Sequence, residues 1–452
     1  EQTLFKGVQK VLPAHWFEWN VRTGGFSTGC YYEMRYRVDE RLTLDEWAQR
    51  IDEALSESVA AHLVSDVEVG GFLSSGVDSS YLVERVLHAG ASAGVGASGV
   101  GAAASGGMGA SSTASAGGSV GADGTKAGGL RTFSVGYADE RFSELPAAQR
   151  LARELGVECV ANTVSADEFF GAMPAIQYHM DEPLPNPSEN PLYFLCENAA
   201  RQVKVVLSGE GADELFGGYP NYSQECATAA YERRVPRLLR RMAGAAAGGL
   251  PAFKGQRFLV RGAIESWQRN SRASYVFASD ECRRFLRSSA EAQYSQTPQD
   301  PQKLSKRYFD EATRFGADAV TQLQYADIKT WLPYDILLKA DRMSMAHSLE
   351  LRVPYLDRRV LEVCLTLPTR FRVQGSASKV ALRKAASRRL PAYVWNREKL
   401  GFPSPLATWL REGRYYQVVR AAFEGATARE FFATSELLRL LDEHRSGKVS
   451  HM

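Results

Sequence analysis

The stretch SSGVDSS, residues 74–80, stands where an apolar run typical of a buried strand gives way to a helical pattern. Small residues let backbone N–H groups approach an anion closely, and serine hydroxyls and the positive end of a helix dipole strengthen the attraction. This chemistry favours phosphate, although the stretch lacks the lysine of a Walker A loop. Asp78 would repel phosphate unless a cation lay between them, which points to Mg²⁺. The alternative is a Ser/Asp helix cap without a ligand.

Two further strand ends carry residues that could bind a ligand. VVLSGEGADELFGGY, residues 205–219, places three acids among glycines, and such glycines let backbone and carboxylates face one ligand. A glycine-rich turn before a helix is the alternative, but turn chemistry alone does not explain so many specific residues. TFSVGY, residues 132–137, could offer backbone groups to the edge of a base, although an ordinary core strand is the simpler interpretation.

The elements that must position these residues follow from apolar spacing. Residues 44–63 and 80–90 have the spacing of helices, the second ending at Gly90, and four apolar runs are typical of strands: 67–73, 131–137, 157–164 and 203–208. Strands that alternate with helices of this length predict an α/β fold, a parallel sheet with helices on both faces. Ligands bind such sheets at the carboxyl ends of the strands. From about residue 220 onward helical patterns dominate, so we expect a largely α-helical C-terminal half.

Residues 89–130 consist almost entirely of Gly, Ala and Ser. This composition cannot bury enough apolar area to offset the entropy lost on ordering, so it predicts a flexible loop inserted between a helix and a strand.

Composition narrows the class of protein. The chain has 452 residues, 44% of them hydrophobic, and a formal net charge of +2, which gives no reason to expect a nucleic-acid partner. Its six cysteines form no C-x-x-C pair and are typical of reduced thiols in a cytoplasmic protein. No apolar run is long enough to span a membrane, and no signal peptide is visible. The chain starts at Glu1 rather than Met and both ends look cut, so we expect a piece of a longer protein.

Five motifs in order resemble the synthetase domain of glutamine-hydrolysing asparagine synthetases: FLSSGVDSS, TFSVGYADERFSELPAAQRLARELG, VKVVLSGEGADELFGGY, LLKADRMSMAHSLELRVPYLD and REKLGFPSPLATWL. The resemblance implies the adenine nucleotide α-hydrolase-like fold of the ATP-pyrophosphatase (PP-loop) superfamily. It places this domain at residues 46–452 and makes residues 1–45 a leading segment after a glutaminase domain. The insertion at 89–130 is not part of the family pattern, and Ser75 stands where the family most often has Gly.

The resemblance also implies a reaction and a site. In the family, the side-chain carboxylate of aspartate attacks the α-phosphate of ATP, and ammonia then displaces AMP from β-aspartyl-AMP. Asp78 and Asp213 match the Mg²⁺-binding acids. The nucleotide-binding positions are Leu73, Ser74, Ser75, Gly76, Asp78, Ser79, Val135, Gly136, Ser208, Gly209 and Lys339. The catalytic positions are Glu210, Arg342, Lys399 and Glu350, the last as a partner of Arg342 or Lys399.

The resemblance leaves the nitrogen source to another domain. The family's ammonia comes from glutamine hydrolysed by an N-terminal glutaminase domain, whose nucleophile is an N-terminal cysteine. Cys30 lies within the chain and has no free α-amino group, so it cannot take that part. We expect a glutaminase domain in cis or in trans, aspartate and ammonia as substrates, neither nucleic acid nor membrane as a partner, and a homodimer as one option for the assembly.

Three other functions stay open. A related synthetase acting on a different carboxylate, such as a β-lactam-forming enzyme or a peptide cyclase, would keep the ATP site, although Glu210 fits the asparagine type better. A tRNA-modifying enzyme would need a basic face, which the balanced charge does not favour. A non-catalytic scaffold would not need intact Asp78, Glu210, Asp213 and Lys399.

Deleting residues 92–127 should leave folding and ATP binding nearly unchanged, because loop-closure entropy changes only slowly with loop length. Thermal denaturation and an ATP titration of the deletion variant check this. A large loss of ATP affinity would contradict it.

Overall fold

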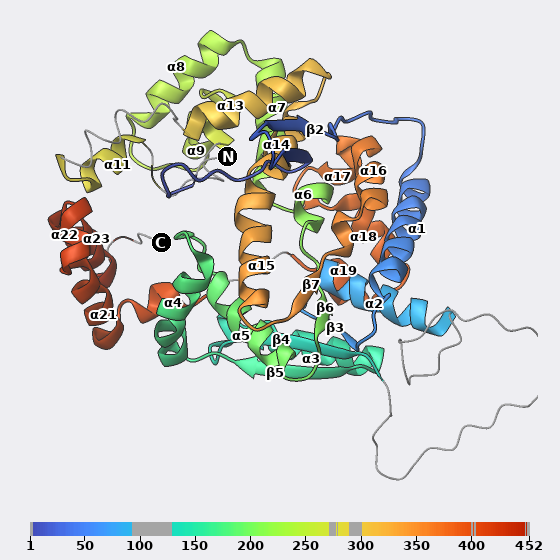
Figure 1. Cartoon of the computed structure of the whole chain (residues 1–452). Coiled ribbons are helices and arrows are strands. Elements are labelled where there is room, and N and C mark those ends of the chain that lie inside the picture. The colour runs from blue at the N-terminus through green and yellow to red at the C-terminus, as the bar shows by residue number, and fades with distance from the viewer. Residues whose placement is uncertain are drawn as a thin grey trace, which may run out of the picture.

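The computed structural model describes residues 3–92, 129–270, 277, 279–288, 301–398, 401, 404–447 and 449. The insertion predicted at 89–130 therefore lies almost wholly outside the described residues. Within them the predicted fold class is confirmed: a parallel sheet is flanked by helices, and the C-terminal half is largely helical (Figure 1).

The central sheet has five parallel strands in the order β5-β4-β3-β6-β7. Their bounds are β3 (Val69–Phe72), β4 (Arg131–Gly136), β5 (Glu158–Thr163), β6 (Val205–Leu207) and β7 (Glu350–Arg352). The chain builds outward from β3 to β5 and then returns to place β6 on the other side of β3. The strand order thus reverses between β3 and β6, which is the point where open α/β sheets bind ligands.

Six helices connect or flank the first four of these strands. They are α1 (Leu44–His62), α2 (Val77–Ser92), α3 (Leu145–Leu155), α4 (Ala166–Met180), α5 (Glu189–Ala200) and α6 (Ala212–Phe216). Local signals start and stop them: Thr43 and Glu46 form a capping box at the start of α1, and α3 ends at Gly156 in a left-handed conformation. The predicted stop at Gly90 is wrong by two residues, because α2 continues to Ser92.

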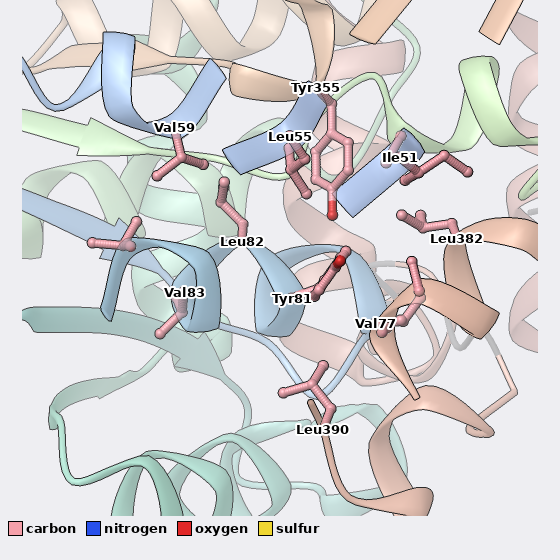
Figure 2. Packing of buried hydrophobic residues seen from close by; sticks show 14 of the residues in the cluster. Ile51, Leu55, Val59, Val77, Tyr81, Leu82, Val83, Tyr355, Leu382 and Leu390 are labelled. Atoms are coloured by element: carbon pink, nitrogen blue, oxygen red, sulfur yellow. The ribbon is translucent and has the colours of Figure 1, made fainter. Parts of the chain in front are cut away.

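Two apolar cores cover the two faces of the sheet. In β6, Val205 and Leu207 belong to one core and Val206 to the other, as alternation along a strand requires. The first core is shared with α1, α2, α16 (Arg358–Thr366) and α18 (Val380–Ala386), and the second with α4, α5 and α15 (Leu337–Met345) (Figure 1). Figure 2 shows side chains of α1, α2 and α18 facing one another around Tyr81 and Tyr355.

The helical half of the chain has a third apolar core. The helices of this half begin with α7 (Pro220–Arg234), α8 (Arg237–Gly248), α9 (Gln256–Gly262), α10 (Ser266–Asn270), α11 (Ser279–Phe285), α13 (Pro301–Arg314) and α14 (Ala319–Lys329). Met34 and Tyr36 of the leading segment pack among α7, α13 and α14. The leading segment is thereby joined to the helical half.

The remaining elements are short or lie toward the C-terminus. Two hairpins are formed by β1 (His15–Trp19) with β2 (Phe26–Cys30) and by β8 (Val373–Gln374) with β9 (Ala377–Ser378). The short helices are η1 (Glu140–Phe142), the π-helical turn η3 (Leu332–Ile336), η4 (Pro354–Leu356), α17 (Thr369–Arg372), α19 (Ala392–Trp395) and α20 (Leu406–Trp409). The last helices are α21 (Gly413–Phe423), α22 (Ala426–Phe431) and α23 (Thr434–Arg445).

None of the helices in the described part of the chain is both long and apolar enough to cross a membrane.

Asp327→Asn should become more stable relative to the wild type as pH rises. Asp327 is buried and accepts a hydrogen bond of 2.7 Å from the Tyr222 hydroxyl, and burial raises its pKa from 3.8 to about 7. The folded state therefore keeps the proton that the unfolded state loses above pH 4, and wild-type stability falls between about pH 4 and pH 7. The unfolding free energy of the variant minus that of the wild type should therefore rise by up to about 4 kcal/mol over this pH range. Urea denaturation across this range measures it, and a constant difference would contradict it.

Candidate active site

A cavity of about 390 Å³ opens at the carboxyl ends of β3, β4 and β6. This volume lies within the range of small-molecule sites. Residues that the sequence singled out line it from several separate segments: Leu73, Ser74, Gly76, Asp78, Ser79, Val135, Ser208, Gly209, Glu210, Asp213 and Lys339. The fold thus brings the three predicted strand ends to one place.

The SSGVDSS stretch comprises the tight turn after β3, residues 74–76, and the first residues of α2, 77–80. The hydroxyl of Ser79 accepts a hydrogen bond of 3.0 Å from the Ser74 N–H and lies 2.8 Å from the Ser74 hydroxyl. The Gly76 N–H donates to the Ser74 hydroxyl at 3.1 Å. Serine side chains therefore hold the loop in the shape that a phosphate would otherwise stabilise, and the same hydroxyls line the cavity.

Ser75 and Gly136 lie beside the cavity but do not line it. The Ser75 hydroxyl is buried and donates to Glu144 Oε1 at 2.8 Å, so this side chain anchors the loop to the segment before α3. A Cβ atom at Gly136 would overlap with Ser143 and Leu145, so only glycine fits at the end of β4. Their predicted nucleotide contacts remain predictions.

Lys379 lies at the centre of the site. Its Nζ forms ion pairs of 2.5 Å with Asp78 Oδ2 and 2.6 Å with Asp213 Oδ1, and the residue is 3% exposed. Burial alone would disfavour the ammonium, but the two carboxylates outweigh it and raise the pKa of Lys379. The backbone of Lys379 is left-handed, with φ of 55°, which is costly for a residue other than glycine. The surrounding structure therefore holds this side chain in place against local strain.

Two glycines make room for this arrangement. A Cβ atom at Gly218 would overlap with the Asp213 carboxylate and the Lys379 side chain. Gly211 has φ of +88° at the start of α6, and a Cβ atom there would overlap with Leu356. The glycines around the acids thus permit close approach, as the sequence pattern suggested.

The carboxylates of Asp78 and Asp213 fit a divalent cation that phosphate oxygens would also coordinate. Asp78 and Asp213 both contact Lys379 Nζ, at 2.5 and 2.6 Å, so the two carboxylates face the same point beside the cavity. No group of three or more metal-binding side chains occurs within the described ranges, and Mg²⁺ commonly takes one or two carboxylates, with phosphate oxygens and water completing its coordination.

Two predicted catalytic positions, Arg342 and Glu350, do not line the cavity, and a third, Lys399, cannot be placed. Arg342 forms an ion pair of 3.0 Å with Asp181, away from the lining residues. Glu350 starts β7, at the edge of the sheet opposite the carboxyl ends, and pairs with Arg352 at 2.7 Å rather than with Arg342. Lys399 lies outside the described residues, although Glu398 and Gly401 line the cavity.

Sequence reasoning missed Lys379, Glu144 and Arg383. Arg383 lines the cavity and donates to the backbone carbonyls of Trp395 and Arg397 at 2.5 and 2.9 Å, which fixes the segment leading to Glu398. No spacing rule connects Lys379 with an acid 301 positions earlier. The one available signal was electrostatic, since two neighbouring carboxylates require a counter-charge.

Lys379→Met should destabilise the protein by about 3–5 kcal/mol, because two partly buried carboxylates then face each other without a counter-ion. For the same reason Mg²⁺ should raise the Tm of the variant more than that of the wild type. Thermal denaturation with and without MgCl₂ measures both effects. Lys384→Met is the matched control: its exposed pair with Asp45 should contribute little to stability. A Lys379 variant as stable as this control would contradict the role of the ion pairs.

Comparison with known proteins agrees with this geometry. The family model described as asparagine synthase matches residues 50–452. The chain is 32% identical over 99% of its length to "Asparagine synthetase [glutamine-hydrolyzing] 1" of Bacillus subtilis and covers 63% of that protein. It is 34% identical over 93% of its length to "Putative asparagine synthetase [glutamine-hydrolyzing]" of Mycobacterium bovis, covering 58% of it, and 23% identical over 90% to "Amidase chry2" of Gibberella zeae, covering 60%.

The chain therefore spans less than two thirds of the length of these relatives. The match nevertheless extends over all five sequence motifs and over every residue that lines the cavity. The chain belongs to the asparagine synthase family.

Proposed function

We propose that this chain catalyses the ATP-dependent amidation of aspartate to asparagine through β-aspartyl-AMP. A β-carboxylate oxygen of aspartate bonds to the α-phosphorus as the bond to the pyrophosphate leaving group breaks. Ammonia then bonds to the acyl carbon, the bond to the AMP oxygen breaks, and a proton leaves the nitrogen. The observation that carries the proposal is the meeting of SSGVDSS, Glu210 and Asp213 in one cavity at the sheet's switch point.

The residues of this chain supply binding and charge. The serine loop, residues 74–76, and the N-terminus of α2 would bind the pyrophosphate portion of the nucleotide through hydroxyl and N–H groups. Asp78 and Asp213 would hold Mg²⁺, which when bound neutralises charge on the phosphate oxygens. Lys379 adds a fixed positive charge next to both acids, where negative charge gathers as pyrophosphate leaves.

Glu210 is the candidate general base for the second half of the reaction. It lines the cavity directly after Ser208 and Gly209 at the end of β6. A carboxylate there could accept the proton that ammonia gives up as the new bond forms.

We further propose that ammonia is normally supplied by glutamine hydrolysis in a domain outside residues 1–452. The relatives from Bacillus subtilis and Mycobacterium bovis are named glutamine-hydrolysing and are longer than this chain.

A second candidate is amide formation on a different carboxylate. The observation that favours it is the match to a protein named an amidase over 90% of this chain. Such an enzyme would share the phosphate side of the cavity and differ in the wall that contacts the acceptor acid.

ATP–pyrophosphate exchange against a panel of carboxylic acids distinguishes the two candidates. Aspartate should support exchange with the highest kcat/KM, because it alone should satisfy both the adenylation site and the acceptor wall. A higher kcat/KM with another acid would overturn aspartate as the acceptor and favour the second candidate.

Glu210→Gln should lower ammonium-dependent turnover by about 10²–10⁴-fold while the KM for ATP changes little, since the acid acts at the reacting carbon. Asparagine and AMP are quantified with ammonium or with glutamine, and the chain should use only ammonium. Glu158→Gln is the control: Glu158 is exposed at the start of β5, away from the cavity. Equal losses in both variants, or asparagine formed from glutamine alone, would contradict these assignments.

A further inference from the structure

Lys339 is a buried cation in the cavity wall. It is 7% exposed and lines the cavity from α15. Among the residues that the structure describes, none forms a hydrogen bond or an ion pair with its side chain. An ammonium held out of water is costly unless an anionic partner contacts it, and Glu189 and Asp335 interact with Lys339 only at a distance. The cavity is the place from which that partner can come.

The surroundings of Lys339 differ from the phosphate side of the cavity. The neighbouring wall is built by the start of α5 and by η3, and it consists of Asn186, Ser188, Pro191, Leu192, Trp331 and Ile336. Most of this surface is apolar, which strengthens an ion pair formed against it. None of these residues belongs to the serine loop or to the segment that carries Glu210 and Asp213.

Two acids stand behind Lys339. Glu189 and Asp335 are both buried, and both interact electrostatically with its ammonium. Each is held by an amide, since Gln177 donates to Glu189 Oε1 at 3.0 Å and Asn186 donates to Asp335. Burial, followed by the charge of Asp335, raises the pKa of Glu189 to about 7. The pair therefore interacts electrostatically with Lys339 without contacting it directly.

The anion that Lys339 binds is unlike those of the nucleotide. All negative charge of ATP lies in its triphosphate, for which the SSGVDSS residues and Lys379 are available, and for which Asp78 and Asp213 would hold a cation. The acceptor brings an additional anion, because an amino diacid keeps one carboxylate after the other has been adenylated. A second positive site on a separate wall matches this second carboxylate.

We propose that Lys339 binds the non-reacting carboxylate of the acceptor acid and thereby selects an amino diacid over a monoacid. The inference rests on the proposed adenylation and goes beyond it by naming the residue that determines the acceptor. It assigns Lys339 to the acceptor, whereas the sequence resemblance grouped it with the nucleotide-binding positions. Glu189 and Asp335 are positioning residues for this ammonium.

The test compares aspartate with β-alanine, which keeps the reacting carboxylate and the amine but lacks the second carboxylate. In ATP–pyrophosphate exchange, Lys339→Met should lower kcat/KM for aspartate about 100-fold, as expected for loss of a charged contact. The same variant should leave kcat/KM for β-alanine and the KM for ATP within about 3-fold of wild type, since neither depends on that contact. Lys339→Arg, which keeps the charge, should retain a preference for aspartate.

The control variant is Lys204→Met, an exposed lysine just before β6, at the opposite edge of the sheet. It should change none of these values. A rise in the KM for ATP in Lys339→Met with an unchanged preference for aspartate would assign Lys339 to the nucleotide and overturn the proposal. Equal losses for aspartate and β-alanine would also overturn it.

The experiment separates failure of this inference from failure of the proposed function. If the wild type prefers another acid with two carboxylates, the comparison is repeated with that acid and its analogue lacking the second carboxylate. If the preferred acid has a single carboxylate, the inference is overturned. If no acid supports exchange, the proposed adenylation fails, and equilibrium dialysis with labelled aspartate decides the role of Lys339: weaker binding by Lys339→Met supports it and equal binding overturns it.

Discussion

The two ion pairs of Lys379 are the interaction on which the site depends. They join the first turn of α2 after β3, the first turn of α6 after β6 and the start of α18, three segments that are remote in sequence. The ion pairs compensate the lost hydration of the buried ammonium only when both carboxylates are close to it. The geometry of all three segments is therefore coupled. The left-handed backbone at Lys379 and the lack of space at Gly218 are local costs of that coupling.

The sheet and its cores determine where those segments meet. Because β3 and β6 are adjacent and parallel, their carboxyl ends lie together at the switch point. The apolar core then fixes the SSGVDSS stretch directly: the buried Tyr355 hydroxyl donates a hydrogen bond of 3.0 Å to the Asp78 carbonyl (Figure 2). Packing of α1, α2 and α18 around Tyr81 and Tyr355 therefore positions a functional carboxylate as well as stabilising the fold.

The cavity has two walls of different origin. Strand ends and the segments after them make the phosphate wall, and helices α5 and α15 with the turn η3 make the wall that carries Lys339. The second wall can change in sequence without altering strand pairing. This division allows one wall to change in sequence while the other is kept. It agrees with the match of this chain both to asparagine synthetases and to a protein named an amidase.

The sequence by itself determined the parallel sheet, most helix positions and the turn at SSGVDSS, because apolar periodicity and small-residue turns are local properties. It also placed Asp78, Glu210 and Asp213 at strand ends, which share one edge of a parallel sheet. Only the tertiary structure decided the rest. It added β7 to the sheet, brought Lys379 between the two acids, and turned Arg342 and Glu350 toward other partners. The pairing of β7 and the ion pairs of Lys379 and Arg342 join residues far apart in the chain, for which the spacing of residues along a chain carries no signal.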